Sequence, residues 1–340
     1  MIVNRLGILR NSMELSILIP ARNEMFLLQT IEDALKQSRA DTEIIAVLDG
    51  EWANPAVPQH PRVNVFHTGN TAGMRAATNY AAKIAKGRYL MKVDAHCAFD
   101  EGFDQKMLEF HERVGEDIVS VPIMRNLWAF DWKCHNCGFK KYQGPTPGEC
   151  KQCGSSDKWR RKMVWKGKSN PQSWAYCFDA EPHFQYHEEY KKRPATKAMR
   201  DEFGYTETMS LQGSCFMCSK ELYWRLNLSD ETLGNWGNQG IEVAAKTWLS
   251  GGRVLVNHAT WYAHMFRTQG GDFSFPYALN GVQSTKRNVR KLFWETGFDG
   301  QRYLLSWLIE KFWPVPGWTQ EQLADLKNKE PTGYISHGTE

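Results

Sequence analysis

Short apolar segments alternate with segments of helical periodicity through the first third of the chain, and this alternation restricts the fold more than any other feature. Apolar runs that fit buried strands lie at Leu15–Pro20, Glu43–Leu48, Val63–His67, Tyr89–Val93 and Ile118–Pro122. Apolar residues recur at helical spacing over Phe26–Ser38, Thr71–Lys86 and Phe103–Val114. This order predicts a doubly wound, mostly parallel α/β sheet, which binds ligands at the carboxyl ends of its strands. Asp49 and Asp94 each end a predicted strand.

The composition is that of an ordinary globular protein. Of the 340 residues, 42% are hydrophobic and 24% charged, and the formal net charge of +4 is too small to indicate a partner. No apolar run approaches the roughly 18 residues of a membrane span, and Met1–Glu14 lacks the apolar core of a secretory signal. We therefore expect a cytoplasmic protein with reduced thiols and no membrane association.

Four of the eight cysteines form two C-x2-C pairs, Cys134 with Cys137 and Cys150 with Cys153. Four thiolates at this spacing suit a tetrahedral Zn²⁺, which contributes folding energy to a segment too small for its own core. All four positions are filled by sulfur, so we expect a structural ion. Two disulfides are the alternative, less compatible with a cytoplasmic protein, and His135 could replace one cysteine.

Positive charge concentrates in the same segment. Residues 133–168 hold eight Lys and two Arg against one Asp and one Glu, a net charge of +8. Aromatic residues are interleaved with these charges, namely Trp132, Phe139, Tyr142, Trp159 and Trp165. This composition is typical of a nucleic-acid-binding surface, although lysines also solubilise small modules.

Asp94 and His96 are the first candidates for metal chemistry. At positions i and i+2 of an extended segment, the two side chains project to the same side. A carboxylate and an imidazole suit a divalent ion that also takes phosphate oxygens, such as Mn²⁺ or Mg²⁺. Taken alone, the D-x-H pattern also fits an aspartate that only caps the next turn.

Other motifs surround this pair in the same order as in a known group of enzymes. Ile19–Glu24 ends the first strand, Asp49–Gly50 ends the second, and Gly73–Asn79 opens the helix before D-x-H. Together they resemble the nucleotide-sugar half of a GT-A glycosyltransferase of the family 2 type. Trp236–Glu242, Trp248–Gly252 and His264–Arg267 resemble, more specifically, the motifs W-G-x-E-N-x-E, W-x-C-G-G and H-x-F-R of the polypeptide N-acetylgalactosaminyltransferases, which also use D-x-H.

This resemblance covers about Leu15–Asp272 without the cysteine-rich insertion, and it implies a GT-A fold with a Rossmann-like sheet. We expect four parts. Residues 1–128 form the nucleotide-sugar-binding half, 129–170 a four-cysteine zinc-ribbon insertion, 171–275 the acceptor- and metal-binding half, and 276–340 a helical C-terminal extension.

The resemblance also implies roles for single residues. Asp94, His96 and His264 would hold the Mn²⁺ or Mg²⁺ that neutralises the diphosphate of the leaving UDP. Asp49 would accept a hydrogen bond from the uracil N–H, and Arg267 would clamp the pyrophosphate. Further nucleotide contacts are expected from Pro20, Ala21, Asn23, Glu24 and Arg75. The sugar is expected to lie against Trp236, Gln212 and Gly213.

One departure from the family pattern bears on the mechanism. The Glu-Asn pair of the family is Gln239-Gly240 here, at the point where inverting family 2 enzymes place a carboxylate base. Gly240 offers no base, which favours retention of configuration, with the departing phosphate taking the proton and Gln212 facing the sugar. Glu242 and Asp230 are the alternative bases.

We therefore expect a metal-dependent hexosyltransferase that moves a sugar from a UDP-sugar to a hydroxyl of a macromolecule. The basic insertion slightly favours a hydroxymethylated pyrimidine of DNA, in the cytoplasm of a bacterium or a phage-infected cell. One alternative is a Ser/Thr O-glycosyltransferase of the polypeptide GalNAc-transferase type. The other is a non-catalytic, zinc-ribbon nucleic-acid-binding protein on a degenerate transferase scaffold.

Overall fold

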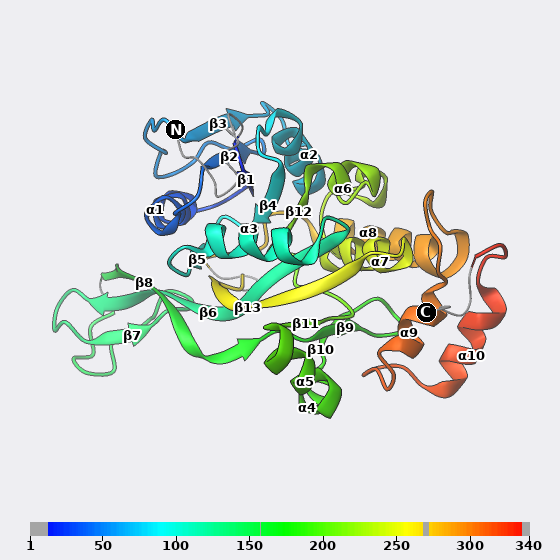
Figure 1. Ribbon diagram of the computed structural model, residues 1–340. Helices are drawn as coiled ribbons and strands as arrows, with labels where there is room; N and C mark the ends of the chain where they lie inside the picture. The colour runs from blue at the N-terminus through cyan, green and yellow to red at the C-terminus, as the bar shows by residue number, and fades with distance from the viewer. Residues whose placement is uncertain (1–12, 157, 268–271, 335–340) are drawn as a thin grey trace.

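The computed structural model describes residues 13–156, 158–267 and 272–334 and shows one large sheet with helices on both faces (Figure 1). Its first strands are β1 (Leu15–Ala21), β2 (Thr42–Leu48), β3 (Val63–His67) and β4 (Tyr89–Val93). They pair in parallel in the spatial order β4-β1-β2-β3. Each is an apolar run, and β1, β2 and β4 are buried along their whole length. The predicted α/β class is confirmed.

The second half of the sheet brings distant parts of the chain together. β12 (Cys215–Ser219) lies antiparallel beside β4, and β6 (Ile118–Cys134) pairs in parallel with β13 (Arg253–His264). β11 (Tyr205–Glu207) forms the edge beyond β13, and the short β5 (Cys97–Phe99) pairs with the end of β13. Because Cys97 and His264 are partners in that pairing, His264 comes next to the residues that follow β4.

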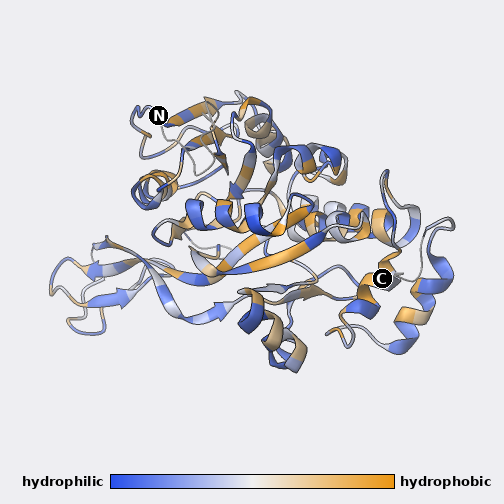
Figure 2. Ribbon diagram, in the orientation of Figure 1, coloured by the Kyte–Doolittle hydropathy of each residue, from blue (hydrophilic) through white to orange (hydrophobic). Residues whose placement is uncertain are grey.

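Helices cover both faces of this sheet. Those of the first half are α1 (Leu27–Gln37), α2 (Met74–Ile84) and α3 (Phe103–Val114). Those of the second half are α4 (Glu188–Lys192), α5 (Pro194–Phe203), α6 (Lys220–Arg225), α7 (Gln239–Leu249), α8 (Leu279–Lys291), α9 (Leu305–Lys311) and α10 (Gln320–Lys329). Hydrophobic residues gather in the central strands and on the inner helix faces, whereas the outer faces are largely hydrophilic (Figure 2).

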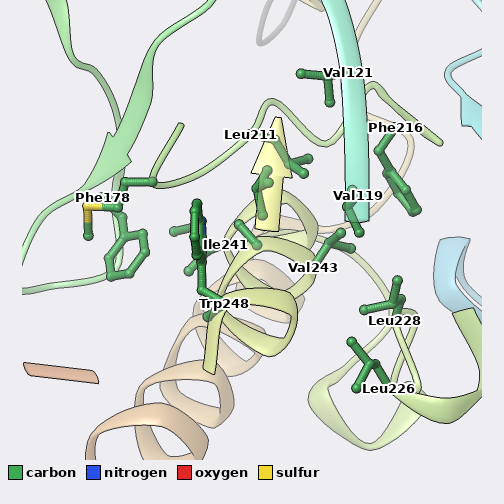
Figure 3. Packing of buried hydrophobic residues seen from close by; sticks show 14 of the residues in the cluster. Val119, Val121, Phe178, Leu211, Phe216, Leu226, Leu228, Ile241, Val243 and Trp248 are labelled. Carbon is green, nitrogen blue, oxygen red and sulfur yellow. The ribbon is translucent and has the colours of Figure 1, made fainter. Parts of the chain in front are cut away.

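The main core is built around α7, in which every residue is buried. Figure 3 shows Ile241 and Trp248 of this helix among side chains from β6, from the 211 loop and from β9 (Tyr176–Phe178). β9 forms a small separate hairpin with β10 (Phe184–Tyr186). The predicted C-terminal helical extension packs onto this core through α9 and α10. A helix buried on all sides positions its first turn firmly, and that turn reaches the site described below.

The cysteine-rich segment is an arm that projects from the body (Figure 1). β6 runs on into the arm, where it pairs antiparallel with β8 (Trp159–Ser173) and with the short β7 (Lys140–Tyr142). Both expected boundaries, at 128/129 and at 170/171, fall inside these long strands. The insertion is therefore continuous with the sheet and has no linker of its own.

One expectation about strands is corrected, because the strand expected at Ile118–Pro122 continues to Cys134. Later in the chain, β13 is also long and ends only at His264, and a loop separates the short strands β11 and β12. No helix within the described ranges combines the length and the apolar character needed to cross a membrane.

Candidate functional site

Three side chains from two separate segments converge at one end of the sheet. Asp94 and His96 follow β4, and His264 is the last residue of β13. The Oδ2 atom of Asp94 lies 3.3 Å from Nε2 of His264 and 3.7 Å from Nε2 of His96. One donor atom from each residue can be chosen so that all lie within 4.8 Å of one another. The convergence predicted from the sequence is present.

This donor set fits a divalent cation. Neither ring nitrogen of His264 makes a hydrogen bond of good geometry with the described residues, although both are buried. Burial lowers the pKa of His264 to about 4, so its imidazole is neutral at neutral pH, the form that ligates metals. Two imidazoles among three ligands favour Mn²⁺ over Mg²⁺, which prefers oxygen ligands. Such an ion supplies positive charge to a leaving diphosphate.

The carboxylate of Glu24 contacts one metal ligand, His96, and is itself held by Arg267. Nδ1 of His96 lies 3.1 Å from Oε2 of Glu24, the kind of contact that fixes the tautomer of a metal-binding histidine. The other oxygen of Glu24 accepts from Arg267, whose guanidinium also donates to the backbone oxygens of Arg22 and Asn23, at 3.2 Å each. Glu24 and Arg267, both expected to contact the nucleotide, therefore form an ion pair that supports the metal ligand His96.

Lys92 is the functional candidate that the sequence analysis missed. Its side chain is 2% exposed, and its ammonium contacts Oδ1 of Asp94 and donates to the backbone oxygen of Gly213 at 2.7 Å. Burial favours the neutral form of Asp94, but Lys92 and the two histidines together hold the pKa of that carboxyl well below 3.8. A lysine in the otherwise apolar strand Tyr89–Val93 is the signal that could have identified it.

The metal triad opens into a cavity of about 550 Å³, a size typical of ligand sites. Its wall includes Pro20, Glu24, Gln212, Gly213, Trp236, Gln239 and Arg267 from the predicted set, together with Gly240. Trp236 lies 5.4 Å from Phe275 and 6.0 Å from Tyr277, between ring centroids, so one side of the cavity is aromatic. His183 and Lys286 also line it, with Lys286 Nζ 2.7 Å from Nε2 of His183.

Asp49 does not reach this wall. Its two oxygens accept from the backbone N–H groups of Ala72 and Gly73, at 2.6 and 3.0 Å, and from the hydroxyl of Tyr277 at 2.6 Å. Asp49 is fully buried, and Ala21 and Asn23 are likewise absent from the lining. In this arrangement Asp49 anchors the segment that carries Tyr277, and it does not present a free acceptor for uracil.

Arg75 and Glu242 form a buried ion pair, which corrects two expectations. The guanidinium of Arg75 lies 2.8 Å from the carboxylate of Glu242, and both side chains are 0% exposed. Arg75 also donates to the backbone oxygens of Gly234 and Gly237, at 3.1 and 2.7 Å. Neither side chain lines the cavity, so Glu242 is not placed to act as a base and Arg75 is not placed to bind the nucleotide. The pair holds the loop that carries Trp236.

Asp230, the other alternative base, makes its contacts outside the cavity. Asp230 accepts from the backbone N–H of Thr232 and lies 3.3 Å from the ammonium of Lys246, outside the cavity wall. The space around Gly240 has no room for a side chain, because a Cβ there would come 1.9 Å from the backbone oxygen of Leu211. Among the described residues, the wall therefore has no carboxylate at Gly240, where the resemblance leads one to look for a base.

The four cysteines of the arm form a compact cluster. Sγ of Cys134 lies 3.9 Å from Sγ of Cys153, and Sγ of Cys137 lies 3.7 Å from Sγ of Cys150. These separations exceed the roughly 2.05 Å of a disulfide bond and match the ~3.8 Å between ligands of a tetrahedral zinc–thiolate site. The disulfide alternative is wrong for this structure, and His135 is not part of the cluster.

Comparison with known proteins agrees with this geometry. Residues 16–167 match the family model described as glycosyl transferase family 2. The chain contains a family 2 glycosyltransferase domain. A putative polypeptide N-acetylgalactosaminyltransferase 13 of Drosophila melanogaster is 24% identical over 306 residues, which are 84% of this chain and 48% of the relative. The human polypeptide N-acetylgalactosaminyltransferase 3 is 24% identical over 82% of this chain and 40% of its own length.

A solved structure is similar over nearly the whole chain. GalNAc-T7, crystallised with UDP, GalNAc and Mn²⁺, superposes with a TM-score of 0.59 at 17% identity, over 94% of this chain and 54% of that one. The family 2 domain therefore has the fold of the GalNAc-transferases, as predicted. The chain spans less than half the length of the curated relatives named here.

Proposed function

We propose that this protein transfers a sugar from a UDP-sugar to a hydroxyl group of a polypeptide, with Mn²⁺ bound by Asp94, His96 and His264. The observation that carries the proposal is the convergence of these three ligands at the mouth of a cavity of about 550 Å³. The relatives support a protein acceptor, since those named are polypeptide N-acetylgalactosaminyltransferases, and the similar structure that contains UDP and Mn²⁺ supports a UDP-sugar donor. The metal would neutralise the charge that develops on the leaving diphosphate.

We propose retention of configuration. The support is the lack of a free carboxylate near Gly240 in the described part of the wall, together with Gln212 and Gly213 in the same wall. Under this mechanism the departing phosphate takes the proton of the acceptor hydroxyl. The side chain of Gln212 is held in one orientation, because its Oε1 accepts a hydrogen bond from the backbone N–H of Ser214 at 2.6 Å.

The proposal includes a structural Zn²⁺ in the arm and a reducing, cytoplasmic setting. The support is the sulfur geometry of the four arm cysteines and the absence of a disulfide among all eight cysteines, which lie within the described residues.

A second candidate acceptor is a hydroxymethylated pyrimidine of DNA, as in phage-type DNA modification. One observation favours it: the arm carries a net charge of +8, and its cations lie over aromatic rings, with Arg161 4.9 Å from the centroid of Trp132. Cations interleaved with aromatic rings are the chemistry of nucleic-acid surfaces.

The test is UDP release from a panel of UDP-sugars with Mn²⁺, offered Ser/Thr peptides or hydroxymethylated DNA. We expect release by the wild type, loss of release in Asp94→Ala, and full release in the control Asp325→Ala, which removes an exposed carboxylate on α10. Equal release by Asp94→Ala would refute the metal-dependent mechanism. No release with any donor would favour the non-catalytic alternative. A β-linked product from an α-linked donor, seen by proton NMR, would refute retention.

A further inference from the structure

A second cavity, of about 710 Å³, lies where the arm joins the body. Its wall comes from α1, from β5 and the turn after it, and from β6, β8 and β13. It shares no lining residue with the cavity of the metal site. The strands β6 and β8 that form one side of it continue into the projecting arm (Figure 1).

Three tryptophans, Trp128, Trp165 and Trp261, line this second cavity. The backbone of β8 packs directly on one of them, because a Cβ at Gly167 would lie 2.5 Å from Cζ3 of Trp261. The indole N–H of Trp165 is buried and has no hydrogen-bond partner among the described residues. Unpaired buried donors are rare in folded proteins, so this N–H is an unsatisfied donor on a residue of the cavity wall.

The cations of the second cavity are also without anionic partners. The guanidinium of Arg125 lies 4.5 Å above the Trp261 ring, and its buried Nε has no hydrogen-bond partner within the described ranges. Neither Arg125 nor Lys166 has an ion pair with a described residue, and Lys168 lies 4.9 Å from the ring centroid of Tyr142. The positive charge at the base of the arm is therefore available to a ligand.

The acidic residues of the same wall are, by contrast, already engaged. Asp33 accepts from the backbone N–H of Phe99 at 2.7 Å, Asp100 from Lys106 at 2.7 Å, and Glu101 from Arg39 at 2.8 Å. Burial also raises the pKa of Asp33. Two of these acids are paired with cations and the third is held by a backbone N–H, whereas the cations have no anionic partner among the described residues, so the cavity favours an anion.

We propose that this second cavity binds a nucleotide unit of a single-stranded nucleic acid, with its phosphate at Arg125 and Lys166 and its base against the tryptophans. Aromatic walls beside unpaired cations are the general chemistry of single-strand binding, and a guanidinium can hold a phosphate through two hydrogen bonds. An acidic peptide would use the cations and leave the three indoles without stacking partners. The proposal goes beyond the proposed function and does not rest on it, because it concerns another cavity.

The surface of the arm extends this site. β8 carries Arg160, Arg161, Lys162, Lys166 and Lys168 in succession. A strand that leaves the cavity along β8 meets further positive charge, so affinity should fall as salt rises.

The experiment measures binding alone. The anisotropy of a fluorescein-labelled thymidine oligonucleotide of about twelve residues, a typical single-strand site size, is followed with UDP and Mn²⁺ saturating the first cavity. An abasic oligomer of equal length should bind about tenfold more weakly, the loss expected when a base no longer stacks. Lys166→Ala and Arg125→Gln should each weaken binding about tenfold and lower the salt slope by roughly one. Lys83→Ala, which removes an exposed lysine of α2 outside the cavity and outside the arm, should change the dissociation constant by less than about twofold.

Four results would overturn the proposal: no binding by the wild type, equal binding of the abasic oligomer, an equal loss in Lys83→Ala and Lys166→Ala, or equal competition by an acidic peptide. Lys166 is exposed, so its variant keeps the test valid even if Arg125→Gln fails to fold.

Discussion

At the scale of single residues, Lys92 gives the metal site a charge balance that the D-x-H motif does not show. Its ammonium contacts one oxygen of Asp94, while the other oxygen faces the two histidines. In the absence of a metal, one carboxylate and one ammonium therefore compensate each other in a cavity wall. A lysine placed in this way repels a cation and attracts a diphosphate.

Lys92→Met should shift the binding of cation and anion in opposite directions. Without the ammonium the site gains a negative charge, so Mn²⁺ alone should bind about tenfold more tightly and metal-free UDP about tenfold more weakly. Titration calorimetry of each ligand measures both constants. Lys106→Met, which removes a half-exposed ammonium paired with Asp100 outside this cavity, should leave both unchanged. Weaker binding of both ligands in Lys92→Met would indicate a structural defect instead.

At Gly240, close packing leaves no room for the side chain that the family pattern has at this position. The first turn of α7 lies so close to the 211–213 loop that a Cβ at 240 would lie 1.9 Å from Leu211 O. This contact brings α7 against the loop of Gln212 and Gly213, two residues that the sugar is expected to contact.

Gly240→Ala should lower the free energy of unfolding by about 1–3 kcal/mol. The clash with a backbone oxygen outweighs the gain of up to about 1 kcal/mol that alanine brings to a helix. Gly281→Ala in α8 is the matched control, because nothing lies within 4 Å of a Cβ there, and it should be neutral or stabilising. Denaturant unfolding measures both, and equal stability of Gly240→Ala and wild type would contradict the packing argument.

At the scale of elements, the sequence predicted those whose apolar pattern is local. β3, β4 and α3 have the predicted bounds, because turn residues flank a clear apolar period in each. Only the first part of β6 was predicted, and β8 was not predicted, since the exposed side chains of β8 give no alternating pattern and the two strands are fixed by pairing with each other. In the site, too, features with a local sequence pattern were predicted and features that depend on distant contacts were not. D-x-H and His264 followed from spacing and resemblance, whereas the engagement of Asp49 by Tyr277 depends on a contact between residues far apart in the chain.

Cys137→Ser should empty the arm of zinc and loosen it without unfolding the body. The arm beyond β6 buries few side chains, so the proposed zinc would supply folding energy there, whereas the body has its own core. Metal analysis by mass spectrometry should show one zinc per wild-type chain and a large loss in the variant, with proteolysis confined to the arm. Cys218→Ala removes a buried thiol of β12 and should keep its zinc. Zinc retained by Cys137→Ser would contradict a four-cysteine site.

At the scale of the whole molecule, the two cavities lie in different places. The metal cavity lies in the body, whereas the second cavity lies where the arm joins the body, and the basic strands run along the arm. An acceptor bound by the arm would therefore be held at a point different from the one at which it reacts. This arrangement suits a macromolecular acceptor better than a small one, whichever polymer it is.

The body also contains buried histidines, which make the stability of the whole protein depend on pH. Burial lowers the pKa of His111 to about 3, and those of His187 and His258 to about 4, from the usual value of 6.5. Between pH 6.5 and these values the unfolded chain binds more protons than the folded chain. The free energy of unfolding should therefore fall as the pH is lowered through this range.

His111 tests this dependence, because it lies in α3 away from the metal site, with Nε2 2.7 Å from Oγ of Ser120. Its protonation in the unfolded chain should cost about 2 kcal/mol of stability between pH 7 and pH 5. His111→Gln retains a polar group near Ser120 and cannot titrate, so denaturant unfolding should show a loss over this range that is smaller than in wild type by about that amount. The exposed His60→Gln should keep the wild-type dependence. An unchanged dependence in His111→Gln would mean that other buried groups cause the acid instability.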